Sequence, residues 1–154
     1  MIDTNMNKSK LYIDVCTLCR PFDDQHRMRI RLETDSYFLI MQAIRDGVYE
    51  LLYSKVHEKE ITAINDILER TEIIETIYQN GKRCSGDFKV IRKRADKLVN
   101  AGLGVADAAH VAFAEVNADY FITCDDRLIK RSKREKVDIM VLTPVEFCVQ
   151  ENLE

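Results

Sequence analysis

Two short apolar runs, LYID at residues 11–14 and YFITCDD at residues 120–126, decide the expected fold of this chain. Both runs are typical of strands buried in a parallel sheet, and both end in aspartate. In open α/β sheets, ligands bind outside the carboxyl ends of such strands. Carboxylates placed there lose hydration unless a cation or a proton compensates them, so the two strand ends indicate a metal site.

The rest of the chain alternates between strand and helix patterns. Apolar runs predict strands, and helical periodicity with capping residues predicts helices. The expected strands are 11–14, 48–54, 119–124 and 137–142, and the expected helices are 25–46, 58–68, 72–78, 87–101, 105–117, 126–135 and one that follows Thr143-Pro144. Residues 80–86 are expected to form a loop. This order predicts an α/β fold, with a mostly parallel central sheet of four or five strands and helices on both faces.

Length and composition bound the class of protein. With 154 residues, 46% of them hydrophobic, the chain is expected to form one domain over residues 1–154. A net charge of -3 excludes a generally basic nucleic-acid coat but not a local basic groove. No apolar run approaches a membrane span, and the first ten residues lack the apolar core of a signal peptide. We therefore expect a cytoplasmic protein without membrane segments.

The five cysteines do not have the spacing of a disulfide scaffold, so reduced thiols are expected. Cys16 and Cys19 do match the C-x-x-C spacing of thioredoxin-like redox sites, which stays open as an alternative. A structural zinc site is disfavoured because no second pair of ligands follows.

Two further acids are expected on helices, facing inward. Glu60 shares a helical face with Ile67 and Leu68, and Asp107 shares one with Val111. An inward carboxylate is costly unless it is paired or binds a cation. Two helices and two strands thus offer carboxylates that converge on one region.

Gathered in one pocket, Asp14, Glu60, Asp107 and Asp125 would repel one another without a cation. Hard oxygen ligands suit Mg²⁺ or Mn²⁺ better than zinc. Such a site could ionise a water molecule and hydrolyse a phosphodiester. The alternative is structural: the two strand-terminal aspartates would cap helices, and the two helical acids would form inward ion pairs.

Seven fragments, in this order and spacing, resemble the PIN-domain family, especially the VapC-type toxin ribonucleases of toxin-antitoxin pairs. They are YIDVC at 12–16, RPFDDQ at 20–25, RIRLE at 29–33, the segment 54–61, DAAHVA at 107–112, ADYFITCDDRL at 118–128 and PVEF at 144–147. Each fragment alone is weak, but together they cover nearly the whole chain.

The resemblance implies a PIN-like three-layer sandwich and a metal-dependent, single-strand-selective endoribonuclease. The implied catalytic and metal-binding acids are Asp14, Glu60, Asp107 and Asp125, with Asp126 as a supporting metal ligand and Thr123 as an orienting residue. The chain departs from the family in the wide spacing before Glu60, which leaves Glu33 as a competing second acid. Glu60 is favoured because it lies on the helix directly after the second strand. Gly104-Val105-Ala106 also departs from the family pattern.

Basic residues follow the second acidic strand end. Arg127, Lys130 and Arg131 are candidates for RNA contact, although a run of charges is also typical of a solvated helix face. The basic stretch 92–97 is a weaker candidate. His110 could act as a general base, but a hydrogen-bonded structural histidine is favoured because metal-assisted hydrolysis does not require a base.

The resemblance also implies partners: an antitoxin protein near the acidic pocket, and a second copy of the chain, with residues 25–46 as the candidate dimer surface. Two other functions stay open. One is a catalytically inactive PIN-like binding module. The other is a haloacid-dehalogenase-like phosphohydrolase, which is disfavoured because Cys16 replaces the second aspartate of its D-x-D motif.

Overall fold

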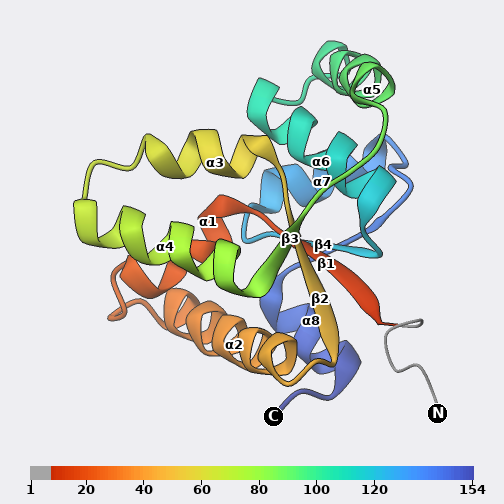
Figure 1. Cartoon of the computed structure of the whole chain (residues 1–154). Helices are drawn as coiled ribbons and strands as arrows, with labels where there is room; N and C mark the ends of the chain where they lie inside the picture. Colours follow the sequence, from red (N-terminus) through yellow and green to blue (C-terminus); the bar gives the residue numbers. More distant parts are fainter. Residues whose placement is uncertain (1–7) are drawn as a thin grey trace, which may run out of the picture.

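The computed structural model describes residues 8–154, in which five strands form one sheet (Figure 1). The strands are β1 (Ser9–Ile13), β2 (Tyr49–Tyr53), β3 (Gly81–Arg83), β4 (Tyr120–Ile122) and β5 (Met140–Leu142). Their order is β3-β2-β1-β4-β5, and every neighbouring pair is parallel. The first strand therefore lies at the centre, with the earlier part of the chain on one side and the later part on the other.

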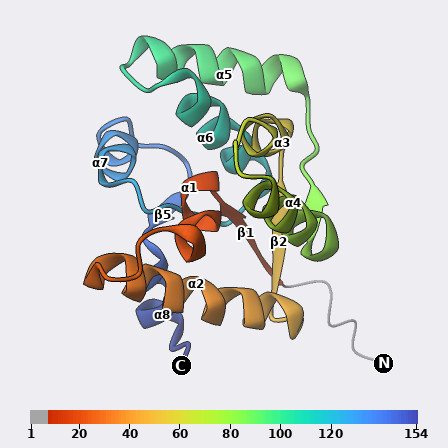
Figure 2. The same cartoon turned by 90° about the vertical axis from the view of Figure 1, so that its left-hand side faces the viewer.

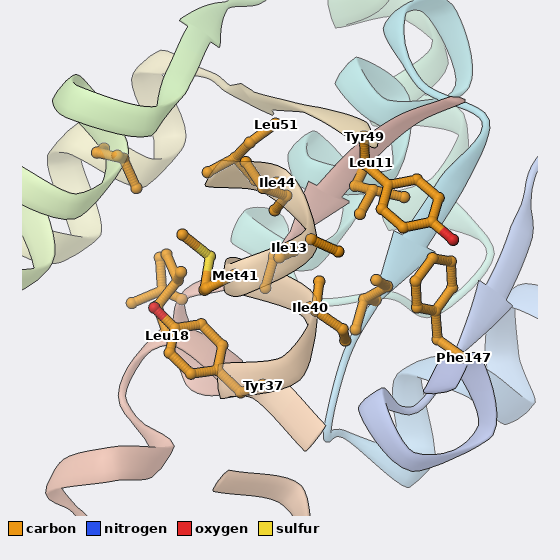
Figure 3. Packing of buried hydrophobic residues seen from close by; sticks show 14 of the residues in the cluster. Leu11, Ile13, Leu18, Tyr37, Ile40, Met41, Ile44, Tyr49, Leu51 and Phe147 are labelled. Carbon is orange, nitrogen blue, oxygen red and sulfur yellow. The ribbon is translucent and has the colours of Figure 1, made fainter. Parts of the chain in front are cut away.

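Side chains alternate across β1, so the sheet buries both of its faces. Leu11 and Ile13 belong to one apolar cluster, and Tyr12 belongs to a second cluster on the opposite face. All three side chains are buried. Figure 3 shows the first cluster, in which Met41 from a covering helix and Phe147 from the C-terminal helix pack over the strand residues. Burial on both faces explains why the strand sequences are apolar runs.

Helices cover the two faces and complete a three-layer α/β sandwich, as predicted (Figures 1 and 2). The first cluster takes buried residues from α1 (Val15–Leu18), α2 (Met28–Arg45), α3 (Lys55–Thr62), α4 (Ile67–Asn80) and α8 (Pro144–Glu151). The second takes them from α5 (Phe88–Asn100), α6 (Val105–Asn117) and α7 (Asp126–Arg134). Helix α3 follows β2, and a short 3-10 helix, η1 (Arg20–Phe22), follows α1. No helix in the described part of the chain has the length and apolar content needed to cross a bilayer.

The segment between β2 and α5 differs most from the sequence prediction. The helix expected over 58–68 is two helices, because α3 ends at Thr62 and Asp66 caps the start of α4. Apolar residues in both helices have the spacing of one helical face, so the sequence pattern predicted a single helix. The short helix expected over 72–78 is the latter part of α4, and the loop expected over 80–86 contains β3. This strand has only three residues, too few for a recognisable alternation.

The last helix begins with a capping box, which gives the first testable prediction. The Thr143 side chain accepts a hydrogen bond from the Glu146 amide, and the Glu146 side chain accepts one from the Thr143 amide. Thr143→Ala should lower the free energy of unfolding by about 1 kcal/mol. Urea denaturation measures this change. Glu146→Gln, which keeps an acceptor for the Thr143 amide, is the matched control and should cost clearly less; equal losses would contradict the capping role.

Candidate active site at the carboxyl ends of β1 and β4

Asp14 follows β1 directly and is buried, with only 6% of its surface exposed. It caps α1: one carboxylate oxygen accepts bonds from the amide (3.1 Å) and the hydroxyl (2.7 Å) of Thr17. The other oxygen accepts from the Cys16 thiol (3.0 Å) and from the Thr123 hydroxyl. The predicted capping role of Asp14 is therefore present, together with a link to β4.

Thr123 connects the two strand-terminal aspartates. Its hydroxyl donates to Asp14 and accepts from the Asp125 amide at 3.0 Å. Asp125 in turn caps α7, because its Oδ1 accepts from the amides of Arg127 and Leu128. Its second oxygen has no protein partner among the described residues. The strand pairing Ile13↔Ile122 thus places both aspartates at one edge of the sheet.

Asp107 lies in the first turn of α6 and is half-buried. Burial raises the pKa of this carboxyl, and the charges of Asp125, Asp14 and Glu60 raise it further, whereas His110 lowers it. The carboxylate makes no hydrogen bond or ion pair with another residue in the described range. Three of the predicted acids therefore act electrostatically on the fourth, as is typical of a carboxylate cluster.

Glu60 reaches this region by a different route from the predicted one. The face shared with Ile67 and Leu68 does not exist, because those residues lie on α4 and are exposed (67% and 76%). Glu60 is instead half-exposed on α3 and its carboxylate is bound by His110. His110 is buried, as expected of a hydrogen-bonded structural histidine. The view in Figure 2 shows α3, α6 and α7 arranged around α1, the elements that carry the four acids or adjoin them.

Glu33 and Asp126 are held in ion pairs with arginines. Glu33 is buried and receives Arg20 at 3.1 Å and Arg29 at 3.5 Å. Arg29 also binds Asp126 through two bonds of 2.8 and 2.9 Å and lowers the pKa of that carboxyl. Neither acid is among the main causes of the raised pKa of Asp107. The geometry favours Glu60 over Glu33 as the second acid and places Asp126 beside the cluster.

The donor set of the cluster suits a hard divalent cation, since it consists of carboxylate oxygens that repel one another. In their present rotamers, no three His, Cys, Asp or Glu side chains of residues 8–154 are close enough to share one ion. Asp14 is turned toward Thr17 and Thr123, and Glu60 is turned toward His110. Among the described residues, Asp107, the second oxygen of Asp125 and Oε2 of Glu60 have no hydrogen-bond partner. His110 binds only Oε1 of Glu60, so Oε2 is open to a cation while that contact stays in place.

The cysteines do not have the properties of a redox centre. All five are free. Burial and the Asp14 charge raise the pKa of Cys16, and burial raises that of Cys19 to about 12. A reactive C-x-x-C thiol needs the opposite shift. The Cys16 thiol instead donates to Asp14, at the position where a phosphohydrolase of the haloacid-dehalogenase type would carry its second aspartate.

Basic side chains begin at Arg127, two residues after Asp125. Arg127 and Lys130 on α7 are exposed, and Arg131 is half-buried. None of the three forms an ion pair with another residue of the described chain, whereas Arg134 at the end of the same helix pairs with Glu135. These charges can therefore accept phosphate groups beside the carboxylates.

A buried polar network behind Glu60 escaped the sequence analysis. It joins Tyr12, Ser54 and His110, with His57 packed beside them. One signal was available: a tyrosine in the middle of a fully buried strand needs a partner for its hydroxyl. The partners themselves come from three separate segments, and their meeting depends on the sheet order.

This three-layer arrangement, with a five-stranded parallel sheet flanked by helices, is consistent with a PIN-like fold. Among solved structures, the chain is similar to FitAcB from Neisseria gonorrhoeae, with a TM-score of 0.52 and 13% sequence identity over 87% of this chain and 97% of the other. At this identity the likeness shows the fold alone. No protein-family model matches the sequence, and a search of curated proteins gives no significant match.

Proposed function

We propose that this protein is a Mg²⁺- or Mn²⁺-dependent endoribonuclease that hydrolyses RNA phosphodiester bonds, acting in the cytoplasm as the toxin of a toxin-antitoxin pair. The observation that carries the proposal is the cluster of Asp14, Glu60, Asp107 and Asp125: Asp107 is half-buried without a protein partner among the described residues, and burial and then the charges of the other three acids raise its pKa. Structural carboxylates are normally paired, so an accumulation of mutually repelling acids favours a cation site. The PIN-like fold and the sequence resemblance supply the substrate class.

In this proposal each residue has a defined task. The four acids would hold the cation, and a bound Mg²⁺ or Mn²⁺ would supply a more acidic water and offset charge on the phosphate. Thr123 keeps Asp14 and Asp125 at a fixed separation through its two hydrogen bonds. Exposed Arg127 and Lys130 bind the phosphates that flank the cut. Asp126 lies beside these acids and forms an ion pair with Arg29.

The toxin assignment adds two partners. An antitoxin would cover the acidic cluster, and an arginine of that partner would satisfy the carboxylates in place of the cation. A second copy of the chain would pack on residues 25–46, where Met28, Leu32 and Phe38 are exposed on α2. Both follow from the resemblance.

Cleavage of single-stranded and structured RNAs with and without Mg²⁺ tests the proposed activity. The expected result is cutting of single strands that needs Mg²⁺ or Mn²⁺ and stops with EDTA. If the pure protein binds neither ion and cuts no RNA, the nuclease proposal is wrong and the inactive binding module becomes the better description.

The adjacent pair Asp125 and Asp126 gives a matched comparison. Asp125→Asn should reduce the cleavage rate by about 100-fold, because it removes a cation ligand while asparagine still caps α7. Asp126→Asn should retain most of the rate, since that carboxylate is exposed and bound to Arg29. Initial rates on one RNA, with circular dichroism to confirm folding, make the comparison. Equal losses in the two variants would contradict the assignment of Asp125.

A further inference from the structure

A chain of hydrogen bonds runs from the centre of the sheet to Glu60. The Tyr12 hydroxyl lies 2.8 Å from the Ser54 hydroxyl and 2.5 Å from Nδ1 of His110. Nε2 of the same imidazole contacts the Glu60 carboxylate. Tyr12, Ser54 and His110 are almost completely buried, whereas 38% of the Glu60 side chain is exposed. The chain therefore ends at the partly solvated acid of the cluster.

The direction of each bond follows from its end points. A carboxylate only accepts, so Nε2 of His110 carries the proton that Glu60 receives. On a neutral ring Nδ1 must then accept, and the Tyr12 hydroxyl is its donor. The Tyr12 oxygen accepts in turn from Ser54, whose own oxygen accepts from the Val56 amide at 3.2 Å. Every polar atom in the chain has one consistent role.

We propose that His110 and Tyr12 are positioning residues for Glu60. Tyr12 selects the imidazole tautomer with its proton on Nε2, and His110 uses that proton to fix the carboxylate of a side chain on a short, partly exposed helix. The inference rests on the proposed function, because it assigns Glu60 its orientation in the cation site. Fixing the rotamer in advance removes the entropy that ordering a free glutamate would cost.

A phenylalanine at position 12 would fill the same space in the second apolar cluster. Packing alone therefore does not require the hydroxyl of Tyr12. The hydroxyl lies where β1 meets the start of α3 and the helix α6. Ser54, the residue that caps the start of α3, is the same residue that bonds Tyr12. The series of hydrogen bonds thus connects the start of the helix that carries Glu60 to His110, the residue that binds the Glu60 carboxylate.

Two experiments test the inference. Two-bond ¹⁵N–¹H NMR spectra of the imidazoles should show His110 with its proton on Nε2 in the wild type and a mixture of tautomers in Tyr12→Phe. In cleavage assays, His110→Leu should lower kcat by about 10- to 100-fold with little change in KM, because His110 does not touch RNA. His110→Gln, which keeps an amide donor for Glu60, should recover about tenfold of that loss.

The outcomes separate this inference from the proposed function. Equal kcat in His110→Leu and His110→Gln, or an unchanged tautomer in Tyr12→Phe, overturns the positioning role while leaving the nuclease intact. Should Tyr12→Phe fail to fold, the two His110 variants still decide. If wild-type protein does not cleave RNA, the proposed function fails. The tautomer spectra alone then show whether Tyr12 selects the His110 tautomer with its proton on Nε2.

Discussion

Replacing Asp107 by asparagine is expected to abolish Mg²⁺-dependent RNA cleavage and, at the same time, to raise the thermal stability of the protein. The loss of rate should be about 100-fold or more, because the substitution removes a carboxylate ligand of the proposed cation site. The gain in stability has a separate cause. Asp107 is half-buried near three other acids, so its charge is unfavourable in the folded state.

The pH dependence of this gain has a definite sign. The pKa of Asp107 is raised in the folded protein above its usual value of 3.8, so the folded state binds the proton more tightly than the unfolded state. Wild-type stability is therefore lost as pH rises through the folded pKa, and asparagine avoids that loss. The melting temperature of Asp107→Asn should exceed that of the wild type at pH 7 and match it at pH 3.

Mg²⁺ should raise the melting temperature of the wild type but not that of Asp107→Asn, because a bound ion stabilises only the form that holds it. Asp35→Asn is the matched control, since Asp35 is exposed on α2 and lies outside the cluster. It should behave as the wild type in all three measurements. A destabilised Asp107→Asn protein at pH 7 would contradict the electrostatic account of the cluster.

His57 is expected to make the protein sensitive to acid. Its ring is buried, with Nδ1 accepting from the Ser54 amide at 3.0 Å and Nε2 donating to the Ile13 carbonyl at 2.6 Å. Burial, and then the neighbouring His110, lower the pKa of His57 from 6.5 to about 3. The unfolded chain therefore takes up this proton first, and stability is lost as pH falls from 6.5 toward 3. The expected loss is about 3 kcal/mol at pH 4.

Urea denaturation at pH 7 and pH 4 measures this loss. His57→Gln cannot titrate, although its amide can still accept from Ser54, so the variant should lose less stability than the wild type on going to pH 4. His26→Gln is the matched control, because the His26 side chain is 99% exposed. Its pH dependence should follow that of the wild type. The same acid sensitivity in His57→Gln would assign the effect to other groups.

Local patterns were sufficient to predict much of this fold. Apolar runs located β1 and β4, and their terminal aspartates were placed at one sheet edge because parallel strands share a direction. Helix α6 has the predicted bounds, since two glycines precede it and its alanines and apolar residues repeat with helical period. The strand order was not predictable, because it depends on which strands pair across long separations.

The candidate site was predictable where an acid adjoins a strand and unpredictable where contacts join distant segments. Glu60 was assigned to the cluster for a wrong reason, because the helix face that suggested it spans two helices. In the structure, the Glu60 carboxylate is bound by His110, which lies on α6 in a later part of the chain. Similarly, Glu33 competes as an acid in the sequence, and only the packing of α2 reveals that Arg20 and Arg29 neutralise it.

The central position of β1 has a consequence for biosynthesis. Asp14 and Glu60 are translated before Asp107 and Asp125, and β4, which lies on the other side of β1 from β2, is translated between these last two acids. A nascent chain that has emerged only as far as β3 holds two of the four acids and lacks the strand that brings the others to them. The four acids can therefore come together only after β4 has been synthesised and has paired with β1.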